Sequence, residues 1–304
     1  MGEPADGWIE RGGVRFHFLD WNPKSGVGHL PPILLLHGLS SNSRYWERVA
    51  RHLPDRRLVA LDQRGHGLTG SPSGAPTATD GYAMNQLLDD IAFTISELRL
   101  GRPVVVGHSW GATVALELVG ARPELASGLV FIDGPVQSAT NLFSWEEAQL
   151  IMQPPLPRFA SFSEALAESK HDFAGAWDDD LESFVKARIV ADGEAFILSL
   201  TAPVRLELLR GLYESQPDLL WPRVEVPTVV LLAQRSAAKI SRSTEKGVTR
   251  LATLAPRVEV RWFDTPHDIP LFKPGEVAAE VERIATQAAG GSASEATPRE
   301  KLQD

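Results

Sequence analysis

The segment VVVGHSWGATVAL, from Val104 to Leu116, passes from an apolar, β-branched run into a helix-forming run within a few residues. It contains the pattern G-x-S-x-G at Gly107, Ser109 and Gly111. A sharp strand-to-helix turn strains the backbone at the serine and leaves no room for side chains at the two glycines. The hydroxyl then stands exposed at a helix N-terminus, where the helix dipole favours developing negative charge. In this context the pattern predicts that Ser109 is a nucleophile.

Short runs rich in Val, Ile and Leu flank this segment on both sides. They are PPILLLHG, RRLVALDQRG, SGLVFIDG, PTVVLLAQ and RVEVRWFDT. Helix-period stretches lie between several of them, at 44–53, 85–98, 112–119 and 277–288. Buried strands that alternate with amphipathic helices predict an α/β fold, with a mostly parallel, doubly wound sheet covered on both faces. Near the N-terminus, WIERGGVRFHFLDW alternates polar and apolar residues around two glycines, which predicts a hairpin.

The alternation breaks once, between residues 135 and 222, where helical patterns dominate and we expect no strand. An insertion of this size between two strands is predicted to form a helical cap over the C-terminal edge of the sheet. A separate helical domain is the alternative. The predicted core therefore comprises 1–134 and 223–289, and the cap comprises 135–222. The small, polar segment 290–304 is predicted to be a disordered tail.

Composition restricts the classes of function. The 304 residues carry a net charge of −9 and include 43% hydrophobic residues, which favours a globular core and argues against nucleic acid or an anionic membrane as a partner. The absence of cysteine excludes disulfides and thiolate metal sites, and no His, Asp or Glu spacing suggests a metal, so we expect no cofactor. The apolar runs fall short of the roughly 20 residues of a membrane helix, and no signal-peptide pattern opens the chain, so we expect a cytoplasmic protein. The oligomeric state stays open.

Three further motifs, together with the serine pattern, resemble those of the α/β-hydrolase family. HGLSSNS at His37 is similar to the family's oxyanion loop, and DQRGHG at Asp62 is similar to its turn after the next strand. TPHDIPLFKP is similar to its histidine loop. The resemblance extends from Val14 to Ala288. It implies an eight-stranded, mostly parallel sheet with an inserted helical cap.

The resemblance also implies roles in an acyl-transfer mechanism. Ser109 would attack an acyl carbonyl, and His267, which follows it in the chain order that this fold requires, would be the general base. The backbone N–H groups of Leu39 and Trp110 would form the oxyanion hole.

Seven further histidines need assignment. His37 and His66 lie in family turns and are expected to hydrogen-bond loop backbone, although His37 is the next candidate for the base. His108 is expected to point away from the nucleophile. The remaining four lie in sequence contexts typical of the surface: His17, His29, His52 and His171.

The third member of a triad is missing from its usual place. In many family members the acid follows the strand that PTVVLLAQ resembles, and here Ala237 occupies that position. Asp133 ends the strand SGLVFIDG, which follows the nucleophile helix. Dehalogenases and fungal zearalenone lactonases are relatives that place their acid there, so Asp133 is predicted to orient His267. The alternatives are that Asp133 only caps the first turn of the cap, leaving a Ser–His dyad, or that Glu245 is the acid.

The sequence gives less information about the type of reaction than about the fold and the site residues. Ser109 counts against haloalkane dehalogenases and epoxide hydrolases, whose nucleophile is an aspartate. Among the serine members, we expect cleavage of a carboxylic ester or lactone, with carbon–carbon bond hydrolases and perhydrolases as alternatives and a small-ligand receptor as an alternative of another class. Most aromatic residues of the cap are expected to pack its core. Trp145, Phe159 and Trp177 are predicted to line a pocket for an apolar or aromatic substrate.

Overall fold

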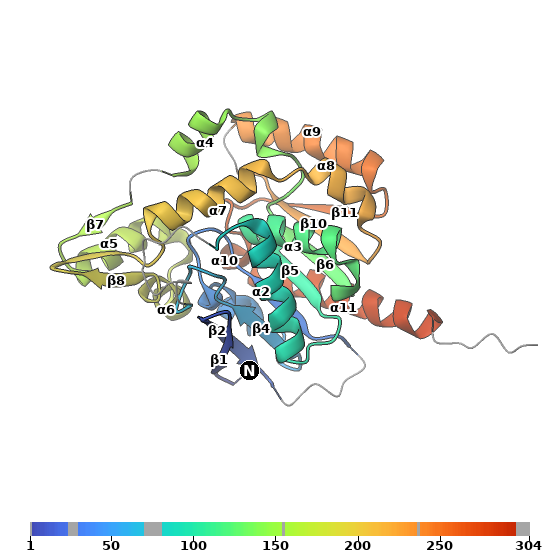
Figure 1. The fold of residues 1–304 in the computed structure, drawn as a ribbon, viewed down its shortest axis with the longest axis horizontal. Coiled ribbons are helices and arrows are strands. Elements are labelled where there is room, and N and C mark those ends of the chain that lie inside the picture. Colours follow the sequence, from blue (N-terminus) through green and yellow to red (C-terminus); the bar gives the residue numbers. More distant parts are fainter. Residues whose placement is uncertain (1, 24–29, 70–80, 154–155, 236–237, 296–304) are drawn as a thin grey trace, which may run out of the picture.

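The computed structural model describes residues 2–23, 30–69, 81–153, 156–235 and 238–295, and its centre is an eight-stranded sheet (Figure 1). The strand order is β1-β2-β4-β3-β5-β6-β10-β11. The hairpin of β1 and β2 is antiparallel, as is the β2–β4 pair, and the other pairs are parallel. The strands are β1 (Ala5–Arg11), β2 (Val14–Trp21), β3 (Ile33–Leu36), β4 (Leu58–Leu61), β5 (Val104–His108), β6 (Gly128–Ile132), β10 (Thr228–Ala233) and β11 (Glu259–Phe263). The predicted fold class is confirmed.

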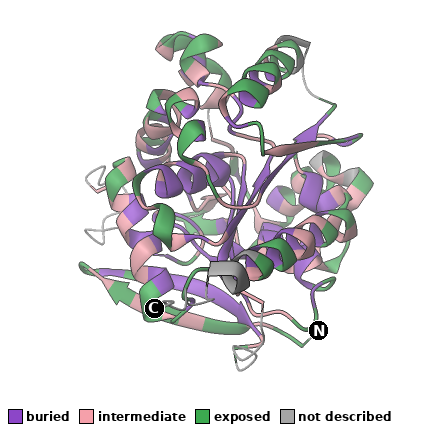
Figure 2. Ribbon diagram, turned by 90° about the vertical axis from the view of Figure 1, so that its right-hand side faces the viewer, coloured by how far each residue is buried: buried purple, intermediate pink, exposed green. Residues whose placement is uncertain are grey.

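Two apolar layers enclose the sheet. The residues of β3 alternate between them, with Leu34 and Leu36 in one layer and Ile33 and Leu35 in the other, as the two-residue period of a strand requires. Figure 2 shows these buried strands between helices on both sides. The first layer contains α2 (Met84–Glu97), α3 (Trp110–Ala121) and the end of α9 (Ala238–Leu254). The second contains the 3₁₀-helix η1 (Ser43–Trp46), α1 (Glu47–Ala50), α10 (Ile269–Phe272) and α11 (Pro274–Glu295).

The insertion between β6 and β10 is mainly helical, but the prediction that it contains no strand is wrong. It includes a three-stranded antiparallel sheet of β7 (Arg158–Phe159), β9 (Ala195–Leu198) and β8 (Ile189–Asp192). A two-residue turn joins β8 to β9, and Gly193 in this turn has a φ of +63°. The sequence IVADGEAFIL is a hairpin signal of the kind that a glycine in a short turn supplies.

In Figure 1 the helices of the insertion extend from the left, where α5 and α6 lie, across the top, where α4 and α7 lie, to α8 beside α9. They are α4 (Trp145–Met152), α5 (Phe162–Asp172), α6 (Asp179–Lys186), α7 (Ala202–Glu214) and α8 (Pro217–Leu220), with the 3₁₀-helices η3 (Ala139–Asn141), η4 (Ala174–Ala176) and η5 (Trp221–Arg223). A further 3₁₀-helix of the core, η2 (Pro123–Leu125), follows α3.

The last helix extends further than predicted. Helix α11 ends at Glu295, so the predicted tail is helical from residue 290 to 295, and residues 296–304 lie outside the described residues. The extended segment, GGSASE, begins with two glycines, whose helix propensity is low, so local propensity does not account for the extension. Neither α11 nor any other helix in the described part of the chain is long and apolar enough to cross a membrane.

The close approach of α3 to the end of β3 gives a stability prediction. A Cβ atom on Gly111 would lie 2.4 Å from Leu36 O and 2.5 Å from His37 O, and these backbone atoms are held by the sheet. We expect Gly111→Ala to lower the free energy of unfolding by about 1–3 kcal/mol, measured by urea denaturation. The matched control is Gly211→Ala in α7, where the added methyl meets only the end of Met84 at 3.7 Å. That variant should gain about 0.5–1 kcal/mol from helix propensity, and equal effects of the two would contradict the packing argument.

Candidate active site

Ser109 stands on the turn between β5 and α3 in a strained backbone conformation. Its φ of +53° and ψ of −117° lie outside the regions that non-glycine residues commonly adopt. Its amide donates to Ile132 O of β6 at 2.8 Å, which ties the turn to the neighbouring strand. A Cβ on Gly107 would lie 2.5 Å from Gly111 O, so the two glycines permit the turn as the sequence predicted. The turn presents Ser109 to a cavity at the edge of the sheet.

The structure brings Asp133 and His267 together. His267 lies in the loop after β11, and its Nδ1 donates to Asp133 Oδ2 at 2.5 Å. Asp133 follows β6 directly, with a φ of +48°, and its other oxygen accepts the Ala233 N–H at 3.0 Å. The alternative acid, Glu245, is exposed on α9, and among the described residues it forms no hydrogen bond or ion pair with His267. Ala237, the usual acid position, lies outside the described residues.

The electrostatics of His267 suit a proton acceptor. Burial lowers its pKa, but the hydrogen bond and the negative charge of Asp133, with a smaller contribution from Asp268, raise the pKa above its ordinary value of 6.5. Its side chain keeps 50% of its accessible surface because it faces the same cavity as Ser109. The Ser109 hydroxyl has no hydrogen-bond partner in the described part of the chain. Hydrogen bonds between a nucleophile and its base often tighten only when substrate binds.

The two predicted oxyanion donors, the backbone N–H groups of Leu39 and Trp110, form no backbone hydrogen bond among the described residues. Trp110 is the first residue of α3, so its N–H has no acceptor within the helix. Over the described ranges, neither this N–H nor that of Leu39 donates a backbone hydrogen bond. A Cβ on Gly38 would lie 3.3 Å from Ser109 Cβ, so the loop that contains Leu39 passes beside the nucleophile. Both N–H groups are therefore available near Ser109.

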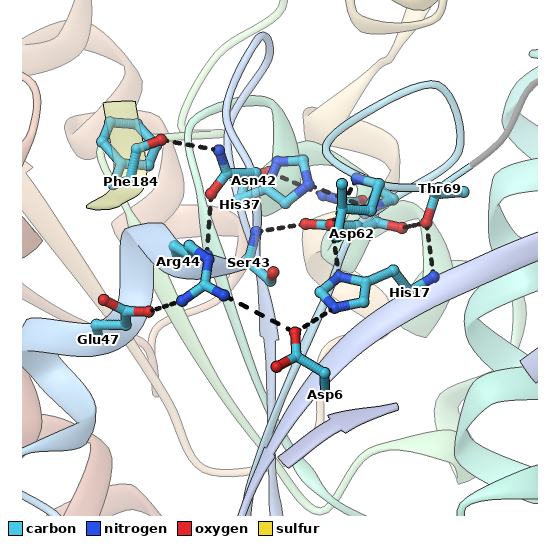
Figure 3. Close-up of polar contacts among 12 residues, drawn as sticks. Asp6, His17, His37, Asn42, Ser43, Arg44, Glu47, Asp62, Thr69 and Phe184 are labelled. Atoms are coloured by element: carbon cyan, nitrogen blue, oxygen red, sulfur yellow. Dashed lines mark hydrogen bonds and ion pairs between the residues drawn. The ribbon is translucent and has the colours of Figure 1, made fainter. Parts of the chain in front are cut away.

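A buried carboxylate anchors the end of this loop (Figure 3). Asp62 Oδ1 accepts the Ser43 N–H at 2.6 Å, and Oδ2 accepts from Leu68 N at 2.9 Å and from His17 Nδ1 at 2.8 Å. The Nε2 atom of His17 lies 2.9 Å from Asp6 Oδ1. Carboxylates only accept, so an imidazole between two of them carries both protons. Burial lowers the pKa of His17, but Asp62 and then Asp6 outweigh it and raise that pKa. The surface position expected for His17 is wrong, since it is 1% exposed.

His37 and His66 hold loop backbone, as expected. His37 Nδ1 lies 2.8 Å from Gly38 O, and its Nε2 accepts the Gln63 N–H at 3.2 Å. His66 Nε2 accepts the Ser40 N–H at 3.1 Å. Complete burial lowers the pKa of His37, and it lowers the pKa of His66 to about 3. Both rings therefore stay neutral and serve as backbone hydrogen-bond partners near neutral pH.

His108 supports the histidine loop from below. Its Nε2 lies 3.2 Å from His267 O, and burial lowers its pKa to about 4, so the neutral ring donates to that carbonyl. Tyr45 stacks on His108 at 4.9 Å between ring centroids and donates to Asp268 Oδ1 at 3.1 Å. His108 thus acts on the loop backbone and not on the nucleophile, as the sequence suggested.

The cavity beside Ser109 has a volume of about 450 Å³, within the range of small-molecule sites. Its wall is mainly apolar and comes from both the sheet edge and the insertion. The apolar lining includes Val136, Leu142, Phe143, Met152, Leu212 and Leu232. Among the residues that the structure describes, no group of three His, Asp or Glu side chains could hold a metal ion.

The three aromatic residues predicted to line the pocket do not line this cavity, and that prediction is wrong. Trp145 packs against Tyr213 of α7 at 5.2 Å between ring centroids. Phe159 is buried in the second apolar layer, and Trp177 lies 5.3 Å below the Lys170 ammonium. These side chains hold the insertion together. The sequence marks the insertion as rich in aromatic residues, but it does not say which face of each short element points inward.

Comparison with known proteins identifies the family and the fold. The family model "Alpha/beta hydrolase family" matches residues 33–280. "Lipase LipV" of Mycobacterium tuberculosis is 32% identical over 262 residues, which cover 82% of this chain and 91% of the lipase. "Epoxide hydrolase 3" of Mus musculus is 29% identical over 194 residues, 58% of this chain and 51% of that protein, so the chain spans about half of its length. The solved structure of "E-2-(Acetamidomethylene)succinate Hydrolase" superposes with a TM-score of 0.76 at 20% identity, covering 93% of this chain and 99% of the other.

The charge coupling between Asp133 and His267 can be measured directly. Because the carboxylate raises the pKa of His267, we expect an NMR titration to place that pKa above 6.5 and Asp133→Asn to lower it. In activity measurements, the same variant should shift the acid limb of kcat/KM to lower pH, since the base must be neutral. The His66 ring should show no titration near neutral pH in either protein. A His267 pKa that does not move in Asp133→Asn would contradict the coupling.

Proposed function

The chain belongs to the α/β-hydrolase family. Within this family, we propose that it is a serine hydrolase that cleaves carboxylic esters or lactones through an acyl-enzyme. The observation that carries the proposal is the cavity that Ser109 shares with the Asp133–His267 pair. A nucleophile, a base and a group that orients the base are the parts that acyl transfer requires.

In the first half of the proposed reaction, Ser109 Oγ attacks the acyl carbonyl carbon and its proton passes to His267 Nε2. The N–H groups of Leu39 and Trp110 bind the negative oxygen of the tetrahedral intermediate. The intermediate collapses when the bond to the alcohol oxygen breaks, and the imidazolium returns the proton to that oxygen. Water then attacks the acyl-enzyme by the same route and releases the acid.

Asp133 is the orienting acid in this mechanism. Its hydrogen bond holds the proton on Nδ1 of His267, so that Nε2 is free to accept the proton of Ser109. The Ala233 N–H fixes the other carboxylate oxygen, which keeps Asp133 from rotating away. The negative charge then stabilises the imidazolium that forms during attack.

The cavity supports a substrate whose acyl or ring portion is apolar. Arg235, at its edge, is already paired with Asp264 at 2.7 and 2.9 Å, so it is a weak anchor for a substrate carboxylate. The likeness to a protein named a lipase, over most of both chains, favours ester cleavage. Epoxide hydrolases also match, but an aspartate is the nucleophile of that group and Ser109 stands in its place here.

Two substitutions test the proposal with a p-nitrophenyl acyl ester. Ser109→Ala should abolish hydrolysis of the ester. Asp133→Asn should lower kcat by about 10⁴-fold because the wrong imidazole tautomer of His267 predominates. Glu245→Gln is the matched control, since it removes the exposed alternative acid and should leave kcat unchanged. Circular dichroism spectra would verify that each variant is folded.

Three results would refute the proposed roles. One is an Asp133→Asn loss below tenfold, and another is a large loss in Glu245→Gln. The third is a serine-directed phosphonate that labels a residue other than Ser109. Tight binding of apolar ligands without any turnover would instead favour a small-ligand receptor.

A further inference from the structure

Thr113 contributes an unusual hydroxyl to the cavity. It lies on α3 one helical turn beyond Ser109, is 5% exposed and lines the same cavity. In the described part of the chain its Oγ1 has no hydrogen-bond partner. This oxygen is also not one of the unpartnered side-chain atoms that are completely inaccessible. The hydroxyl is therefore buried within the protein but open to whatever occupies the cavity.

Helical threonines usually satisfy their hydroxyl on their own helix. In this chain Thr94, Thr244 and Thr286 each donate to the carbonyl four residues earlier, at 2.8, 3.0 and 2.9 Å. For Thr113 that carbonyl is Ser109 O, which already accepts the backbone N–H groups of Ala112 at 3.0 Å and Thr113 at 3.2 Å. The strained turn thus occupies the acceptor and leaves the Thr113 hydroxyl free.

Three other polar side chains of the cavity already have hydrogen-bond partners. Ser215 Oγ donates to Glu117 Oε1 at 2.7 Å, and Thr244 donates within its helix. Arg235 is held by a carboxylate outside the cavity, Asp264. Thr113 differs from these three because both its donor and its acceptor capacity face the substrate space.

We propose that Thr113 binds a hydroxyl on the acyl portion of the substrate, so that the enzyme favours esters or lactones of 3-hydroxy acids with an apolar chain. The inference rests on the proposed role of Ser109 as the acylated residue. Thr113 lies four residues beyond Ser109, a rise of about 6 Å along the helix. Three bonds lead from the carbonyl carbon to a hydroxyl oxygen on C3, and together with a hydrogen bond of about 2.8 Å they span a separation of this size. A hydroxyl matches Thr113 better than a keto group, since it both donates and accepts.

The test compares p-nitrophenyl 3-hydroxyoctanoate with p-nitrophenyl octanoate. The wild-type enzyme should prefer the 3-hydroxy ester in kcat/KM, and Thr113→Val, which keeps the shape and removes the hydroxyl, should lower that preference about threefold to tenfold. Thr113→Ser restores the hydroxyl and should restore most of the preference. Ser215→Ala is the matched control, because it removes a cavity hydroxyl that is already donated and should change both esters alike.

A binding experiment tests this inference independently of the proposed function. The Kd values of 3-hydroxyoctanoate and octanoate are measured for Ser109→Ala and for Ser109→Ala/Thr113→Val, so no turnover is required. Tighter binding of 3-hydroxyoctanoate that is lost with Thr113→Val supports the inference even if no ester is hydrolysed, which would refute only the proposed function. Equal Kd values for the two acids, or a preference that survives Thr113→Val, would overturn the inference. The Thr113 hydroxyl would then bind water and not the substrate.

Discussion

The contact between the start of α3 and the end of β3 is the constraint on which the site depends. Helix α3 begins so close to the carbonyls of Leu36 and His37 that only glycine fits at position 111. The approach forces the turn at Ser109 and places the loop after β3 beside it. Since neighbouring parallel strands end at the same edge of the sheet, β5, β6 and β11 bring Ser109, Asp133 and His267 to one cavity.

The strand order also explains how the acid could change position without moving the histidine. Strand β6 lies between β5 and β10, and β11 is the next strand after β10. Asp133 donates its backbone N–H to Leu231 O at 2.7 Å and accepts the Ala233 N–H, so β10 still positions the carboxylate although it does not supply it. In the proposed mechanism, Asp133 at the end of β6 therefore supplies the carboxylate that the sequence lacks after β10.

The sequence predicted the features that follow from the periodicity of apolar residues and from positions where only glycine leaves room for the backbone. Strands β3, β4, β5, β6, β10 and β11 were anticipated from apolar runs, and the hairpin of β1 and β2 was anticipated from its alternating pattern. The glycines around Ser109 marked the turn, because all of these signals are local. The position of Asp133 next to His267 could be anticipated because strand ends converge. The small sheet of the insertion and the directions of the Trp145 and Trp177 side chains were not predicted from the sequence. Those depend on how short elements pack against one another, and neither composition nor periodicity encodes that packing.

The histidines show how one residue type is divided between structure and chemistry. His66 and His108 are held neutral by burial, and both ring nitrogens of His66 and the Nε2 atom of His108 hydrogen-bond to backbone groups. His17 is buried too, but Asp62 and Asp6 raise its pKa and hydrogen-bond both of its ring nitrogens. His267 combines features that these three lack: it faces the cavity, and Asp133 stabilises its protonated form without sealing Nε2. A general base must gain and lose a proton in each cycle, and the environment of His267 permits both states.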